Sequence, residues 1–171
     1  MLTQCKKQGR VGGRAGFSLI EVLVAVILVG IAITALMVAN GAFTQVNGAG
    51  IDLSTAEFLI EQLRERTAML RVIDADTGTT TFGPETGETT AAAYDDLDDF
   101  DDAAFCPPVD AEGMPLAEFA SFTQYVEVEN VEAASLGTVV DDGTTDFVRF
   151  TVTILQNTAS ISSANWIRAQ Y

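Results

Sequence analysis

The chain has 171 residues, a formal net charge of −15 and 48% hydrophobic residues, which is enough for one domain with a modest core. Its 24 acidic residues argue against direct binding to nucleic acid, because an acidic domain repels phosphate groups. The chain has no His, no Ser nucleophile motif, no Cys/His metal set and no glycine-rich phosphate loop. We therefore expect a protein that is not an enzyme and carries no cofactor, with calcium as the one candidate considered below.

An apolar segment near the N-terminus is long enough to cross a membrane. Residues 17–39 contain one charged side chain, Glu21, and no Pro. As a helix rising about 1.5 Å per residue, they would span the ~30 Å hydrocarbon core of a bilayer. Four basic residues precede this segment: Lys6, Lys7, Arg10 and Arg14. By the positive-inside rule we expect a single-pass protein of the inner membrane, with its N-terminus in the cytoplasm and its C-terminal part outside.

Two ordinary explanations of this N-terminus are a cleaved secretory signal and an uncleaved signal anchor. The apolar region of a secretory signal has about 7 to 15 residues, which is shorter than the segment here. A signal anchor fits the length but gives no role to Glu21. A carboxylate in a membrane helix costs about 2.5 to 3.5 kcal/mol near the centre, and less near the interface. No Lys or Arg lies between Phe17 and Gln62 to pair with it.

Cleavage between Gly16 and Phe17 would supply that partner. It creates a new α-amino group at the start of the apolar helix. Glu21 of one copy would then neutralise the amine of a neighbouring copy when the helices pack side by side. On this hypothesis Glu21 is an assembly residue.

The segment Gly16-Phe17-Ser18-Leu19-Ile20-Glu21-Val22-Leu23-Val24-Ala25, behind a basic leader, resembles the prepilin signal of type IV pilins and type II secretion pseudopilins. The resemblance implies that a prepilin peptidase removes residues 1–16 after Gly16 and N-methylates Phe17. It also implies that Glu21 acts in docking and helix register. The implied partners are other pilin or pseudopilin subunits and an inner-membrane assembly platform, and the implied destination is a pilus or pseudopilus filament.

One departure from the resembled family concerns proline. Many major pilins have a Pro about midway along the N-terminal helix, and here no Pro precedes Pro84. This favours a minor pilin or pseudopilin. The sequence leaves open whether the filament is a retractile pilus, a secretion pseudopilus or a DNA-uptake apparatus. The alternative function is an uncleaved, membrane-anchored extracytoplasmic acidic binding domain, with calcium as its candidate ligand.

We expect four segments in the chain: a leader at 1–16, a transmembrane and assembly helix at 17–39, an amphipathic helix extension at 40–73 and an acidic extracytoplasmic head at 74–171. Apolar residues recur in the extension at helical spacing: Ala56, Leu59, Ile60, Leu63 and Leu70. Three glycines weaken the helix just beyond the membrane: Gly41, Gly48 and Gly50. Ser54-x-x-Glu57 is either a capping box of a restarted helix or two solvated side chains within a continuous one.

Residues 77–90 are rich in Thr and Gly and predict a loop. Six aspartates follow it between Tyr94 and Asp102: Asp95, Asp96, Asp98, Asp99, Asp101 and Asp102. One interpretation is a solvated loop or short helical turn, anchored by Tyr94, Leu97 and Phe100. The other is a calcium site, since calcium takes six to eight oxygen ligands. The spacing does not match the EF-hand pattern.

Two β-strands are predicted towards the end of the chain, at 122–132 and 146–155, because apolar and polar residues alternate there. Asp142-Gly143 predicts a turn between them, and the strands would pair antiparallel either directly or with Val139-Val140 between. The amphipathic helix around 55–70 would cover their apolar faces. The fold class is therefore α+β, a long N-terminal helix packed on a small C-terminal antiparallel sheet, as in pilins.

The two cysteines do not pair in a processed chain. Cys5 would leave with the leader, which leaves Cys106 as a single thiol. We expect Cys106 to be packed or semi-exposed, with an intermolecular disulfide as the alternative.

Overall fold

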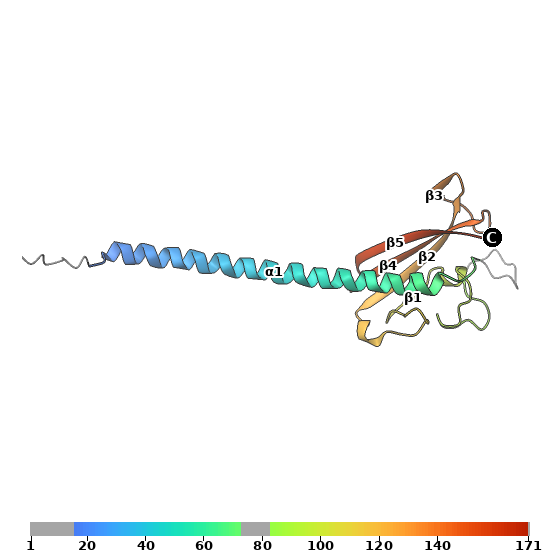
Figure 1. Cartoon of the computed structure of the whole chain (residues 1–171), viewed down its shortest axis with the longest axis horizontal. Coiled ribbons are helices and arrows are strands. Elements are labelled where there is room, and N and C mark those ends of the chain that lie inside the picture. The colour runs from blue at the N-terminus through green and yellow to red at the C-terminus, as the bar shows by residue number, and fades with distance from the viewer. Residues whose placement is uncertain (1–15, 73–82, 171) are drawn as a thin grey trace, which may run out of the picture. The chain divides into compact units, whose positions relative to one another are not determined.

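The computed structural model describes residues 16–72 and 83–170 (Figure 1). Its elements in chain order are α1 (Leu19–Thr67), the 3-10 turn η1 (Asp98–Phe100), β1 (Ala104–Phe105), the 3-10 turn η2 (Ala117–Phe119), β2 (Phe122–Glu132), β3 (Ser135–Val139), β4 (Phe147–Gln156) and β5 (Ala159–Ala169). The chain divides between Asn47 and Gly48 into two compact units. Most of the predicted leader, and residues 77–82 of the predicted loop, lie outside the described residues.

The N-terminal unit is the first part of α1. Ser18 begins the helix, because its hydroxyl and its carbonyl oxygen both accept the backbone N–H of Glu21, at 3.3 and 3.1 Å. Every residue from Gly16 to Asn47 is exposed in the single chain. Within the described part of the chain, α1 is the one helix long and apolar enough to cross a membrane. The long apolar N-terminal helix expected from the sequence is confirmed.

The helical hydrogen bonding of α1 continues through Gly41, Gly48 and Gly50. Of the two interpretations of Ser54-x-x-Glu57 that the sequence left open, the continuous helix is correct and the restarted helix is wrong. The Ser54 hydroxyl donates to the carbonyl oxygen of Gly50 at 2.9 Å, which is the local bond of a Ser inside a helix. A helical glycine costs only about 1 kcal/mol relative to Ala, so packing of the following turns outweighs it.

α1 ends at Thr67, earlier than the expected end near Ile73. The Thr67 hydroxyl donates to the carbonyl oxygen of Leu63 at 2.8 Å. The guanidinium of Arg168, from β5, donates to the carbonyl oxygens of Thr67 and Leu70 at 2.7 and 2.9 Å. The Thr67 carbonyl oxygen also accepts the backbone N–H of Leu70 at 3.3 Å, so Arg168 adds charged hydrogen bonds at the end of the helix and just beyond it.

The head contains a five-stranded antiparallel sheet with the order β1-β2-β4-β5, and β3 pairs with the end of β2. The two predicted strands are present as β2 and β4. They pair directly, from Phe122 opposite Gln156 to Asn130 opposite Val148, which settles the question left open by the sequence. Val139 instead belongs to β3, opposite Val131. The Asp142-Gly143 turn lies between β3 and β4, with Gly143 at a φ of +67°.

The strand β5 was not expected from the sequence. It pairs with β4 along the length of that strand and forms one edge of the sheet. On β5, Trp166 stacks on Phe150 of β4, with ring centroids 5.0 Å apart. β1 is short and pairs with β2 through Ala104 and Phe105.

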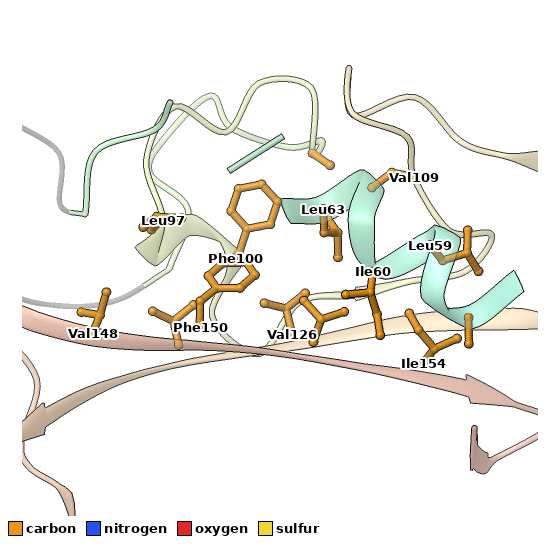
Figure 2. Close-up of a cluster of buried hydrophobic side chains, with 14 of the residues drawn as sticks. Leu59, Ile60, Leu63, Leu97, Phe100, Val109, Val126, Val148, Phe150 and Ile154 are labelled. Atoms are coloured by element: carbon orange, nitrogen blue, oxygen red, sulfur yellow. The ribbon is translucent and has the colours of Figure 1, made fainter. Parts of the chain in front are cut away.

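One face of the sheet is covered by α1, as expected (Figure 2). Leu59, Ile60 and Leu63 point from the helix towards the sheet side chains Val126 and Ile154, and all five are buried. A second part of the cover comes from the segment before β1 and the loop after it, which carry Leu97, Phe100 and Val109. The α+β arrangement of a long helix and a small antiparallel sheet is therefore confirmed.

Candidate functional site

The N-terminal candidates lie at the start of α1. Gly16 and Phe17 precede the first helical residue, and Phe17 is 81% exposed. Glu21 is the acidic residue of the first turn. Its carboxylate makes no hydrogen bond or ion pair with any residue that the structure describes. The first turn thus presents one unpaired negative charge on an exposed apolar helix.

A local hydrogen bond in the first turn was missed from the sequence. Ser18-Leu19-Ile20-Glu21 has the spacing of a capping box, and half of the box forms: the Ser18 hydroxyl accepts the backbone N–H of Glu21, while the Glu21 carboxylate makes no bond to Ser18 in return. A negative charge in the first turn is also favourable to the helix dipole. The Ser-x-x-Glu spacing was the signal that would have found it. Any assembly role of Glu21 must therefore be separated experimentally from helix capping.

The acidic segment of the head is not solvated as the first interpretation had it. Asp96, Asp98 and Asp99 are each at most 1% exposed. The expected short helical turn and its anchors are present, since Leu97 and Phe100 are fully buried. Tyr94 packs edge-on to Phe100, with ring centroids 5.0 Å apart. Because the anchors lie between the aspartates in the sequence, burying them also carries the carboxylates inward.

Backbone hydrogen bonds hold part of the acidic segment. One carboxylate oxygen of Asp99, Oδ2, accepts the N–H groups of Asp95 and Asp96 at 3.0 and 3.3 Å. Asp96 Oδ1 accepts the N–H of Asp99 at 3.3 Å. The remaining oxygens of Asp96 and Asp99, and Oδ1 of Asp98, are buried without a hydrogen-bond partner among the described residues.

The electrostatics of this segment follow from burial. Burial raises the pKa of Asp96 from its ordinary value of 3.8 to about 8, with contributions from the neighbouring Asp98 carboxyl. Burial likewise raises the pKa of Asp99 to about 7 and that of Asp98 to about 6. The three carboxyls therefore resist being charged together in the folded head.

Two groups of three carboxylates each bring an oxygen atom to within 4.8 Å of the others. One group is Glu85, Asp96 and Asp99, and the other is Glu88, Asp95 and Asp99. Glu85 and Glu88 were missed from the sequence, because they belong to the Thr- and Gly-rich segment that predicts a loop. Two acidic residues shortly before an aspartate run were the signal that would have added them.

Of the other predicted aspartates, Asp98 joins neither group, and Asp101 and Asp102 are directed to β2. Asp101 accepts the backbone N–H of Val128 at 2.9 Å, and Asp102 accepts the hydroxyl of Tyr125 at 2.8 Å. They join neither group of three carboxylates. Cys106 is an exposed free thiol, with its sulfur 3.8 Å from the carbonyl oxygen of Ala120.

Comparison with known proteins bears on the N-terminus. Residues 12–37 match the protein family described as "Prokaryotic N-terminal methylation motif". No curated protein and no solved structure matches the chain. The matched residues include Gly16, Phe17 and Glu21, so the match confirms the resemblance drawn from Gly16 to Ala25.

Proposed function

Because residues 12–37 carry the N-terminal methylation motif, the signal of type IV pilins and pseudopilins, we propose a structural role for the protein. It is a subunit of a type IV pilus or type II secretion-like filament. A prepilin peptidase cleaves it after Gly16 and N-methylates Phe17. An inner-membrane assembly platform then packs α1 against other pilin subunits, with the head outside the cytoplasm. Its role is structural rather than catalytic.

The observation that carries this proposal is the place of Glu21. It is the one charged residue in the apolar part of α1, in the first turn of an exposed helix. No basic residue lies between Arg14 and Arg64, so the neighbouring sequence supplies no counter-charge. A carboxylate at such a position is costly in a membrane unless it is paired. The α-amino group of Phe17 on an adjacent subunit supplies that pair once the leader is removed.

We place the protein among the low-copy subunits of the filament. Residues 19–67 contain no Pro, and the helical hydrogen bonding of α1 runs through its glycines. A helix without the midway Pro is more common among minor pilins and pseudopilins than among major pilins. Measuring the ratio of this subunit to the main filament protein in purified filaments tests this point, and a ratio above one would contradict it.

The first experiment is mass spectrometry of the N-terminus. The full chain is recovered from membranes of a host with a prepilin peptidase and of an otherwise identical host without it. We expect a mature chain that begins at N-methylated Phe17 in the first host and an intact leader in the second. A leader retained in both hosts would identify an ordinary signal anchor and contradict the proposal.

The second experiment separates assembly from helix capping at Glu21. Glu21→Ala removes the carboxylate, and we expect this variant to be inserted and cleaved but absent from sheared filaments. Ser18→Ala is the matched control, because it removes the side-chain cap and leaves the charge; we expect it to be incorporated. Equal loss of both variants from filaments would point to capping instead, and normal incorporation of Glu21→Ala would remove the proposed pairing.

A further inference from the structure

We propose that the head binds a calcium ion between the carboxylates of Glu85, Asp96 and Asp99. Each of these residues brings a carboxylate oxygen to within 4.8 Å of the other two. Asp96 and Asp99 flank the start of η1, while Glu85 comes from the preceding loop. The ion would join these two segments of the head. This inference does not depend on how Phe17 is processed.

The evidence for a ligand here is the burial of oxygens that nothing satisfies. Asp96 is 1% exposed and Asp99 is fully buried. In each carboxylate one oxygen accepts backbone N–H groups, and the other has no hydrogen-bond partner in the described parts of the chain. Buried polar atoms in proteins are almost always paired, and an uncompensated buried charge is far more costly than a neutral group. A bound cation would satisfy both oxygens and compensate the buried charge.

The protein itself does not provide that charge. No Lys or Arg occurs between Arg71 and Arg149, and the chain has no His. Three arginines of the head are engaged elsewhere: Arg66 with the carbonyls of Ala91 and Tyr94, Arg149 with Glu129, and Arg168 with the carbonyls of Thr67 and Leu70. Arg64 pairs with Glu61, which is exposed. Arg71 meets Asp96 through its backbone, and its exposed side chain forms no ion pair with any described residue.

The geometry fits calcium. Oxygens bound to one calcium ion at 2.3 to 2.6 Å lie up to about 5 Å apart, which agrees with the spacing of the three carboxylates. Magnesium demands a tighter octahedron at about 2.0 to 2.1 Å and keeps most of its water. Bidentate carboxylates and water would complete the six to eight ligands of calcium.

The second group, Glu88, Asp95 and Asp99, is the less suitable site. Asp95 is exposed, and it has no oxygen that is buried without a partner. Asp99 is shared by the two groups, whereas Asp96, which also carries an orphaned oxygen, belongs to the first group alone. We therefore assign the ion to Glu85, Asp96 and Asp99, and the second group supplies the control variant.

The test uses the full chain in detergent micelles, with CaCl2 alone as the probe. Unfolding temperature and calcium binding are measured in EDTA and in about 2 mM CaCl2, because extracellular modules bind calcium with Kd values of about 10⁻⁴ to 10⁻³ M. Salt is held at about 0.15 M, where screening beyond about 8 Å suppresses non-specific attraction to the acidic head. We expect calcium to raise the unfolding temperature and to bind with a stoichiometry of one.

Two neighbouring aspartates give a matched pair of variants. Asp96→Asn keeps an oxygen for the N–H of Asp99 and removes one charge, so the head should fold and should unfold at a higher temperature than the wild type in EDTA. Its calcium affinity should fall by at least about tenfold. Replacing a residue that only hydrogen-bonds to a metal ligand already costs about this much, and Asp96 is proposed as a ligand itself. Asp95→Asn removes the same charge one residue away and should keep the calcium response.

The proposal would be overturned by a wild-type chain that neither binds calcium nor unfolds at a higher temperature in its presence. It would also be overturned if Asp95→Asn lost the response and Asp96→Asn kept it, since the ion would then belong to the other group. Equal, small losses in both variants would indicate only diffuse attraction to a negative surface, which again contradicts a site.

Discussion

A single buried amide joins three parts of the head. Gln124 of β2 is fully buried beneath α1. Its Oε1 accepts the N–H of Val109 at 2.7 Å, and its Nε2 donates to the carbonyl oxygens of Leu59 and Val109 at 3.0 and 3.1 Å. A glutamine amide offers two donors and one accepting oxygen, so its side chain is almost completely used. It links α1, β2 and the loop that carries Val109.

Replacing this amide by an apolar group should destabilise the head. Gln124→Leu leaves the Val109 N–H and the Val109 carbonyl oxygen without their side-chain partner, while the Leu59 carbonyl oxygen keeps its bond within α1. We expect the free energy of unfolding to fall by about 2 to 4 kcal/mol, because each orphaned group costs about 1 to 3 kcal/mol. Urea unfolding of the full chain in micelles measures this. The exposed Gln170→Leu is the control, and a change within about 0.5 kcal/mol is expected there.

The buried aspartates make a prediction about pH for the calcium-free chain. Burial raises the pKa of Asp96 to about 8, of Asp99 to about 7 and of Asp98 to about 6, against 3.8 in the ordinary state. At pH values between 3.8 and these raised pKa values, the folded chain binds more protons than the unfolded chain. The free energy of unfolding therefore falls as pH rises. In EDTA we therefore expect stability to be highest near pH 4 and to decline up to about pH 8.

Unfolding temperatures across this pH range in EDTA provide the measurement. Asp96→Asn should flatten the decline, because it removes the carboxyl with the highest pKa. A stability that instead rises from pH 4 to pH 8 in EDTA would mean that these carboxyls are readily charged in the folded head.

The sequence located the residues of the acidic segment but not their environment. The spacing of Tyr94, Leu97 and Phe100 predicted anchors, and the anchors are present. Whether the intervening carboxylates are solvated depends on how deeply the anchors pack against Phe150, 5.8 Å from Phe100 between ring centroids, on a strand much later in the chain. That contact has no local signal. The pairing of Glu85 with Asp96 is equally a product of the tertiary fold.

At the level of elements, the end of α1 depends on β5. Arg168 reaches from the edge strand to the carbonyl oxygen of Thr67, the last residue of α1, and to that of Leu70 just beyond it. Helical periodicity extended the predicted helix towards Ile73, since Leu70 fits the apolar spacing. The helix ends earlier, where it meets the guanidinium of Arg168. That residue is 101 positions from Thr67 and 98 from Leu70 in the sequence.

Removing this guanidinium should loosen both elements. Arg168→Met keeps much of the aliphatic stem and loses both bonds to carbonyls. We expect the free energy of unfolding to fall by about 1.5 to 3 kcal/mol, the range for hydrogen bonds with a charged partner. Hydrogen exchange at the end of α1 and urea unfolding measure the effect. Arg64→Met removes an exposed ion pair and a cation–π contact with Trp166, 5.0 Å from the ring centroid, and should cost less, about 1 kcal/mol.

The strands differ in how well the sequence predicts them. Both β2 and β4 contain a stretch in which apolar and polar residues alternate, from Val126 to Glu129 and from Val148 to Ile154, and both were predicted. On β5 the residues that pack against the core are Ile161, Ala164 and Trp166, which do not alternate. The register shifts opposite Ile154 and Leu155, so Ile161 is the extra residue of a bulge. Because β5 is rich in Ser and Ala and its alternation is interrupted by the bulge, its sequence does not predict a strand.

At the scale of the whole molecule, the hydrophobic core belongs to the C-terminal unit alone. The first buried apolar residue is Ala56, and residues 16–51 are all exposed in the described chain. The N-terminal signal could be read from the sequence because it is a linear motif whose meaning does not depend on the fold. The function of the head cannot be read in the same way, because its candidate site is assembled from separate segments.

This division predicts that the head folds without the apolar helix. A fragment of residues 48–171 retains every buried core residue and lacks the exposed apolar segment. We expect it to be monomeric without detergent and to unfold cooperatively. Gel filtration and thermal unfolding followed by circular dichroism are the measurements. Aggregation of the fragment, or a gradual loss of structure on heating, would show that residues before Gly48 are needed for folding.

The bond between Arg168 and the end of α1 also bears on the proposed export of the head. A head exported as proposed would cross the membrane in the order of its sequence. In that order α1 comes first and β5 comes last. The edge of the sheet, the ring of Trp166 and the helix cap all come from that strand. Contacts this distant in sequence form slowly and late. If the head is exported as proposed, we expect it to cross the membrane unfolded and a chain stalled before Ala159 to remain sensitive to proteases.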